Sequence, residues 1–135
     1  MNRILFGKNE FCGPSVLSAI CGISTDEAAA VLSSITGRNK VAGIYIRELK
    51  SAFNQLGYNC VDVLLPRGTS LFASLFTLHG KDGQYIFTIP GHFIAIELNG
   101  NHKYICDNHT KEPINVGASA RLSMRVQHVF KVVKR

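Results

Sequence analysis

Cys12 is the residue of this chain whose type and position best fit a nucleophile. It directly precedes Gly13 and Pro14, and because proline is favoured in the first turn of a helix, we expect the thiol at a helix N-terminus. Free amides at such a terminus favour the thiolate and can lower a cysteine pKa from about 8.5 to about 3.5–7.5. The alternative is a small residue packed under a helix end, and Cys12 alone does not distinguish the two.

His92 and Asp107 could complete this chemistry. His92 follows Pro90-Gly91 and begins an apolar run, which predicts a position at the rim of a sheet. A neutral imidazole there can accept the thiol proton and later protonate a leaving group. Asp107 ends the next predicted strand, and neighbouring antiparallel strands can bring their ends together, so its carboxylate could orient the His92 ring. Each residue also has a structural explanation, His92 as a strand-end residue and Asp107 as a turn residue.

The remaining candidates for chemistry are weaker. The spacing of His102, Cys106 and His109 could suggest a metal, but no fourth ligand accompanies them, so we predict no metal site. Residues 80–83 lack the phosphate-loop pattern and predict a turn, and no cofactor is expected. The other three cysteines lie among apolar neighbours, where a thiol behaves as a small buried hydrophobic group; they are Cys21, Cys60 and Cys106.

The elements that must position these residues divide the chain into two halves. Helix signals dominate the first half, including a capping-box pattern at Ser24 and Glu27. The predicted helices cover residues 13–20, 24–37, 45–56 and 71–78. The predicted strands cover residues 58–65, 84–89, 92–98, 103–106 and 125–133, with a hairpin turn at Asn99-Gly100. This order predicts an α+β fold in which N-terminal helices pack on a C-terminal antiparallel β-sheet.

Length and composition indicate an ordinary globular protein. The chain has 135 residues, of which 46% are hydrophobic, so we predict a single domain over residues 1–135. No apolar run approaches the roughly 18–20 residues that cross a bilayer, and the N-terminal apolar stretch is too short for a secretory signal. We therefore expect a soluble cytoplasmic protein without membrane contact, in a host cytoplasm if the chain is viral.

The last predicted strand is strongly basic. Residues 121–135 contain five basic and no acidic side chains. We expect a solvated outer strand, with Val126, Phe130 and Val132 on one side, whose charges discourage edge pairing. Nucleic acid is not the expected partner, because neither interleaved aromatic residues nor a nucleic-acid motif accompanies the charge.

The sequence resembles the papain-like cysteine peptidases, above all the bacteriocin-processing peptidase domains of peptide-exporting transporters and their freestanding relatives. The resemblance rests on Asn-Glu-Phe-Cys-Gly-Pro-Ser at 9–15, Gly-His-Phe-Ile-Ala-Ile at 91–96 and Tyr-Ile-Cys-Asp-Asn at 104–108. It implies a papain-like fold with Cys12 as nucleophile, His92 as general base and acid, and Asp107 as the residue that orients the imidazole.

One position departs from that family. Its members usually place a glutamine six residues before the nucleophile, where it helps to form the oxyanion hole, and here this residue is Phe6. Asn9 has the nearest amide side chain, and we expect it to assist the Cys12 backbone N–H in holding the oxyanion. Loss of one such donor typically costs about 10²–10³-fold in rate.

These observations predict a thiol-dependent hydrolase of amide or peptide bonds that acts on a peptide or protein through an acyl-enzyme. The same three residues also serve acyl transfer and deamidation, so the reaction that follows acylation stays open. A second hypothesis is a catalytically weak papain-like domain that binds proteins or peptides. A third is a basic nucleic-acid-binding domain, whose affinity would depend steeply on salt.

Overall fold

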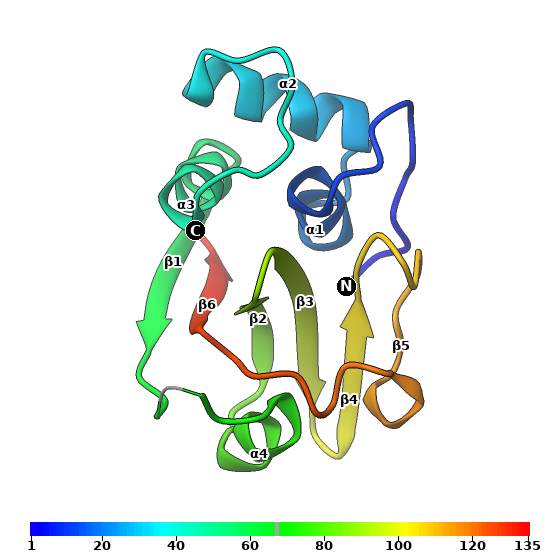
Figure 1. Cartoon of the computed structure of the whole chain (residues 1–135), viewed down its shortest axis with the longest axis vertical. Helices are drawn as coiled ribbons and strands as arrows, with labels where there is room; N and C mark the ends of the chain where they lie inside the picture. The colour runs from blue at the N-terminus through cyan, green and yellow to red at the C-terminus, as the bar shows by residue number, and fades with distance from the viewer. Residues whose placement is uncertain (67) are drawn as a thin grey trace.

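The computed structural model describes residues 1–66 and 68–135 and has the expected α+β fold (Figure 1). Three N-terminal helices come first: α1 (Cys12–Cys21), α2 (Thr25–Thr36) and α3 (Ile46–Gln55). The rest comprises β1 (Tyr58–Val63), α4 (Leu71–Thr77), β2 (Gly83–Ile89), β3 (His92–Asn99), β4 (His102–Cys106), β5 (Ile114–Asn115), a 3-10 turn at Val116–Ala118 and β6 (His128–Lys134). The N-terminal helices pack on an antiparallel sheet, which confirms the predicted fold class.

Local hydrogen bonds account for the helix boundaries. The Ser24 hydroxyl caps α2 by accepting a hydrogen bond from the Glu27 backbone N–H at 3.1 Å. The Glu48 carboxylate caps α3 by accepting the Tyr45 backbone N–H at 2.7 Å. Gly37 ends α2 with φ of 71°, a left-handed conformation that favours glycine. Because these signals act over a few residues, the predicted helices agree with the structure to within one residue at each end.

The six strands form one sheet in the order β1-β6-β2-β3-β4-β5, with every neighbouring pair antiparallel. The prediction that the basic C-terminal strand lies at the outside of the sheet is therefore wrong, because β6 lies between β1 and β2. Its charge is accommodated because the side chains reach solvent. The Lys131 ammonium lies over the Tyr85 ring, 5.8 Å from its centroid, and Arg135 donates a hydrogen bond to Asn54 Oδ1 at 2.7 Å.

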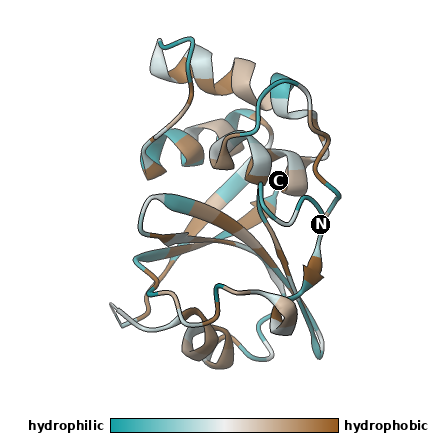
Figure 2. Ribbon diagram, turned by 45° about the vertical axis from the view of Figure 1, so that its right-hand side comes forward, coloured by the Kyte–Doolittle hydropathy of each residue, from teal (hydrophilic) through white to brown (hydrophobic). Residues whose placement is uncertain are grey.

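Each face of the sheet is covered by a hydrophobic cluster. Residues such as Phe130 and Val132 pack against α1, α2 and α3, whereas Phe87 and Val126 pack with α4 on the opposite face. Apolar stretches run along the strands and α4 in Figure 2. The prediction that Val126 shares a side with Phe130 and Val132 is wrong. β6 begins only at His128, and Val126, in the segment before it, packs in the cluster that contains α4.

Short elements were not predicted. β5 and the 3-10 turn at Val116–Ala118 contain two and three residues, which is too few for a periodic hydrophobic pattern. In the described part of the chain, none of the helices is long and apolar enough to cross a membrane.

Candidate active site

The first residue of α1 is Cys12, as the sequence predicted. Gly13, Val16, Leu17 and Ile20 are buried, so most of this helix is enclosed by protein. Gly13 is closely packed, because a Cβ atom there would lie 2.7 Å from the end of the Ile44 side chain, which would have to shift. The start of α1 therefore packs against the segment that contains Ile44.

The loop before Cys12 is fastened to the start of α2. The Asp26 carboxylate accepts hydrogen bonds from the backbone N–H groups of Lys8, at 2.9 Å, and Asn9, at 3.0 Å. The Gly7 N–H donates to the Thr25 hydroxyl at 2.9 Å. A side chain at Gly7 would overlap the Asp26 carboxylate. This anchoring limits the freedom of the chain that enters α1.

His92 and Asp107 are brought together by the antiparallel pairing of β3 and β4. His92 begins β3. Asp107 directly follows Cys106, the last residue of β4, and Cys106 pairs with Ala95 of β3. The His92 Nε2 and Asp107 Oδ2 atoms lie 3.0 Å apart. This contact leaves Nδ1 as the ring atom that can serve the thiol of Cys12.

Asp107 is fully buried, and its carboxylate is surrounded by hydrogen-bond donors. Its Oδ1 atom accepts the backbone N–H groups of His109 and Thr110 at 2.8 and 2.9 Å. Its Oδ2 atom contacts His92 and accepts the Arg121 Nε–H at 2.9 Å. Burial alone would raise the pKa of this carboxyl, but these hydrogen bonds and the Arg121 charge hold it well below its usual range. Asp107 is therefore a carboxylate at neutral pH.

Cys12 and His92 favour the charged forms of one another. Burial would raise the pKa of the Cys12 thiol, but hydrogen bonding to His92 and to the Phe93 amide, with the imidazolium charge, lowers it from its ordinary value. Burial would lower the pKa of His92, but its hydrogen bonds to Asp107 and Cys12 raise that pKa to about 8. Since the two groups titrate as a coupled pair, the arrangement shifts both pKa values in the direction of a thiolate beside an imidazolium.

The other three cysteines differ from Cys12 in this respect. All four thiols are free. Burial raises the pKa of Cys21 to about 12 and the pKa values of Cys60 and Cys106 to about 11. Cys106 is fully buried, and Cys21 and Cys60 are half-buried against the hydrophobic cluster below the helices. Cys12 is thus the cysteine with a lowered pKa.

An open cleft of about 500 Å³ adjoins Cys12 and His92. None of its lining residues is Lys, Arg, Asp or Glu among the residues that the structure describes. The walls come from α1, the segment before α3 and the rim of the sheet; the lining side chains include Phe11, Val41, Ile44, Tyr45, Thr88, Ile89, Phe93, Asn108, Gln127 and His128. The cleft therefore suits an uncharged segment of a ligand.

Asn9, the expected oxyanion donor, does not line this cleft in the described structure. Its side-chain oxygen accepts the Phe11 backbone N–H at 3.0 Å, and its own N–H donates to Asp26. Asn9 thus shapes the turn before α1. The structure brings Cys12, His92 and Asp107 together, and it leaves Asn9 outside the group.

Three residues of the site were not identified from the sequence. Arg121 contacts Asp107 from a loop 14 residues further along the chain, and Gln127 and His128 line the cleft. All three fall in the basic C-terminal segment that was interpreted as a solvated strand. The sequence carries no local signal for them, because their place depends on the insertion of β6 into the sheet.

Comparisons with known proteins relate this geometry to a known fold. No protein-family model matches the sequence, and no curated protein is significantly similar to it. The structure is similar to the crystal structure of a double glycine motif protease from an AMS/PCAT transporter in complex with the leader peptide. The match has a TM-score of 0.66 at 12% sequence identity and covers 100% of this chain and 93% of that chain. The chain therefore has the papain-like α+β fold of a double-glycine motif protease, as its sequence motifs indicated.

Proposed function

We propose that this protein is a thiol-dependent hydrolase of peptide bonds, with Cys12 as nucleophile, His92 as general base and acid, and Asp107 as the orienting residue. The observation that carries the proposal is the position of His92 between the Cys12 thiol and the buried Asp107 carboxylate, at the edge of an open cleft. A nucleophile, a base within reach and a third group that orients the base together form the arrangement used in covalent acyl transfer.

In the acylation step, the Cys12 thiolate attacks the carbonyl carbon of the scissile amide. The oxyanion that forms is stabilised by the Cys12 backbone N–H in the first turn of α1, where helical amides lack intrahelical acceptors. The His92 imidazolium gives its proton to the leaving nitrogen, and the C–N bond breaks. The products of this step are a free amine and a thioester on Cys12.

In the deacylation step, neutral His92 takes a proton from water as the water oxygen attacks the thioester carbon. The C–S bond then breaks, the acid product leaves, and the thiolate–imidazolium pair is restored. Asp107 keeps Nε2 occupied throughout, so Nδ1 faces the reacting atoms in both steps.

A peptide substrate is supported by the cleft and by the structural neighbour. The cleft beside Cys12 is open, and its described lining contains no Lys, Arg, Asp or Glu, which suits an extended, uncharged stretch of peptide. The double glycine motif protease of the same fold was crystallised with a leader peptide. We include acyl transfer to another amine as a variant of the same chemistry, because it differs only in what attacks the thioester.

The first test is the pH dependence of iodoacetamide labelling at each cysteine, mapped by mass spectrometry. We expect Cys12 to be alkylated at pH 6 about 100-fold faster than the other three cysteines, because its thiolate is favoured and theirs are not. In His92→Ala the selectivity should be lost below pH 8, since the imidazolium that stabilises the thiolate is gone.

His79→Ala is the matched control for this experiment. His79 lies beyond α4 and contacts Lys103, so its replacement should leave Cys12 labelling unchanged. Equal, slow labelling of all four cysteines, unaffected by His92→Ala, would overturn the catalytic proposal and leave a papain-like binding module as the leading hypothesis. Selective labelling would justify a screen of quenched peptide substrates, with Cys12→Ala as the inactive reference.

A further inference from the structure

The Asp107 carboxylate serves two cations through one oxygen. Oδ2 contacts His92 Nε2 at 3.0 Å and Arg121 Nε at 2.9 Å. The Arg121 side chain is 22% exposed, whereas Asp107 is fully buried. A guanidinium at this distance pairs with the carboxylate in a partly desolvated setting, where charge pairs act more strongly than at an open surface.

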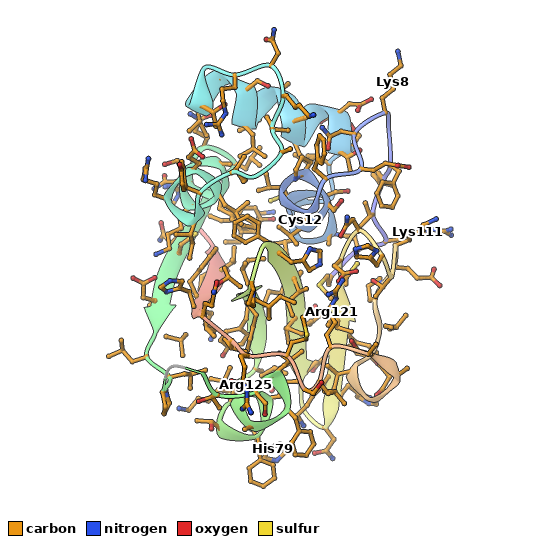
Figure 3. All side chains as sticks on the ribbon, in the orientation of Figure 1. Lys8, Cys12, His79, Lys111, Arg121 and Arg125 are labelled. Carbon is orange, nitrogen blue, oxygen red and sulfur yellow. The ribbon has the colours of Figure 1, made fainter. Side chains whose placement is uncertain are left out.

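Arg121 reaches Asp107 from a segment that is not part of the sheet. It lies after the 3-10 turn at Val116–Ala118 and before β6. Its own backbone N–H donates to the Ser119 hydroxyl at 3.1 Å, which fixes the start of the side chain. In Figure 3 the Arg121 side chain lies beside β4, whereas Arg125 lies near α4. The two arginines belong to one loop but contact different parts of the protein.

We propose that Arg121 is a positioning residue of the active site: it holds the Asp107 carboxylate and partly balances its charge, so that Asp107 orients His92 with a reduced negative field. This inference rests on the proposed function, because it assigns a role within the same set of residues. The Asp107–Arg121 pair then supplies the hydrogen bond of a carboxylate, but it attracts the imidazolium less strongly than a lone carboxylate would.

Several other groups face His92 and must be considered together with Arg121. Cys12 approaches from α1, Asp107 from the end of β4, and His109 from the following turn, with its ring centroid 5.5 Å from that of His92. His128 of β6 lines the same cleft. In this set Arg121 is the permanent cation, and its charge opposes protonation of His92.

The consequence is an upper limit on how strongly His92 holds its proton. A general acid must release that proton to the leaving nitrogen, and proton transfer is efficient when the pKa of the acid lies near the working pH. An uncompensated carboxylate would raise the pKa of His92 further above 8. Arg121 keeps the imidazolium acidic enough to act.

The test is an NMR titration of the His92 imidazole in full-length protein carrying Cys12→Ala, which removes the coupled thiol. In that background Arg121→Gln should raise the pKa of His92 by about 0.5–1 unit, because a cation near the imidazolium is lost. Arg121→Lys keeps the charge and should leave this pKa within about 0.2 unit of the parent.

Arg125→Gln is the matched control. It removes one positive charge from the same loop, but the Arg125 guanidinium donates to the Gly68 carbonyl oxygen at 3.1 Å and does not contact Asp107. We expect no change in the His92 titration. A His109→Gln variant assigns the NMR signal of the neighbouring imidazole. That signal must disappear in the variant, while the signal of His92 remains.

A purely structural role for Arg121 predicts that Arg121→Gln lowers the pKa of His92 instead of raising it. If Arg121→Gln merely released Asp107, the His92 hydrogen bond would weaken and the pKa of His92 would fall; this result, or no change, would overturn the proposal. The readout is separate from the proposed function, which is judged by Cys12 alkylation in protein that retains the thiol. Selective alkylation with an unmoved His92 pKa would refute the role of Arg121 alone.

Discussion

His92 has a different partner at each of its two ring nitrogens. Nε2 contacts Asp107 at 3.0 Å, and Nδ1 is left for the Cys12 thiol. The burial of both Cys12 and His92 opposes charge, so the thiolate–imidazolium pair depends on hydrogen bonds and on mutual attraction. A single substitution at any of the three residues should therefore change the titration of the others.

We expect Asp107→Asn to lower the pKa of His92. An asparagine can still orient the ring, but the carboxylate that balances the Arg121 charge is lost, so the imidazolium is less stable and the thiolate–imidazolium pair loses its second proton at a lower pH. The pKa of His92 in an NMR titration should fall by about one unit. An unchanged titration would show that Asp107 does not influence the pair.

Among the elements of the fold, α2 contributes to the site through its first turn. The Asp26 carboxylate accepts the Lys8 and Asn9 backbone N–H groups and thereby holds the loop that leads into α1. Asn9 in turn accepts the Phe11 N–H just before Cys12. The position of Cys12 therefore depends on a helix none of whose residues is among the described residues that line the cleft.

We expect Asp26→Ala to cost about 1 kcal/mol of unfolding free energy and to speed amide hydrogen exchange at Lys8 and Asn9. The cost arises because two backbone donors lose their charged acceptor. Glu27→Ala is the control, since it removes a neighbouring carboxylate from the same helix turn and should cost only a few tenths of a kcal/mol. Equal effects of the two variants in urea unfolding would show that the helix dipole, and not the loop, accounts for the loss.

For the whole molecule, the buried Asp107 links stability to pH. Its pKa is lowered in the folded state by donors from three segments of the chain, namely His92, the turn at His109 and Thr110, and Arg121. A group with a depressed folded pKa stabilises the fold above its unfolded pKa, about 3.9 for aspartate, and this stabilisation is lost as the pH falls. The carboxylate is thus a point of acid sensitivity at the centre of the site.

We expect the urea midpoint of the protein to fall steeply between about pH 4 and pH 2, with a loss on the order of 2 kcal/mol from Asp107. Asp107→Asn should lower stability at pH 7 but flatten this acid limb, because no proton is then taken up at the position. Asp62→Asn is the control: Asp62 pairs with Lys50 with 68% of its side chain exposed, so the acid limb should be retained. If Asp107→Asn left the acid limb unchanged, the loss of stability at low pH would arise from another group, for example Glu97.

The sequence by itself pointed to Cys12 as the candidate nucleophile and determined the types of most elements. Helix caps such as Ser24, and the Asn99-Gly100 hairpin, act between residues close in the chain, so they can be recognised without tertiary contacts. The same hairpin pairs β3 with β4, and this pairing is why His92 and Asp107 could be expected to meet.

Only the tertiary structure decided where the C-terminal segment lies. The insertion of β6 between β1 and β2 depends on Phe130 and Val132 packing beneath α1 and α3, and no local pattern distinguishes this from an outer strand. That insertion also brings His128 to the cleft and carries the chain past Asp107, where Arg121 binds. The positions of β6 and of Arg121 depend on long-range burial and on the Asp107–Arg121 charge pair, whose energies arise only between residues distant in sequence.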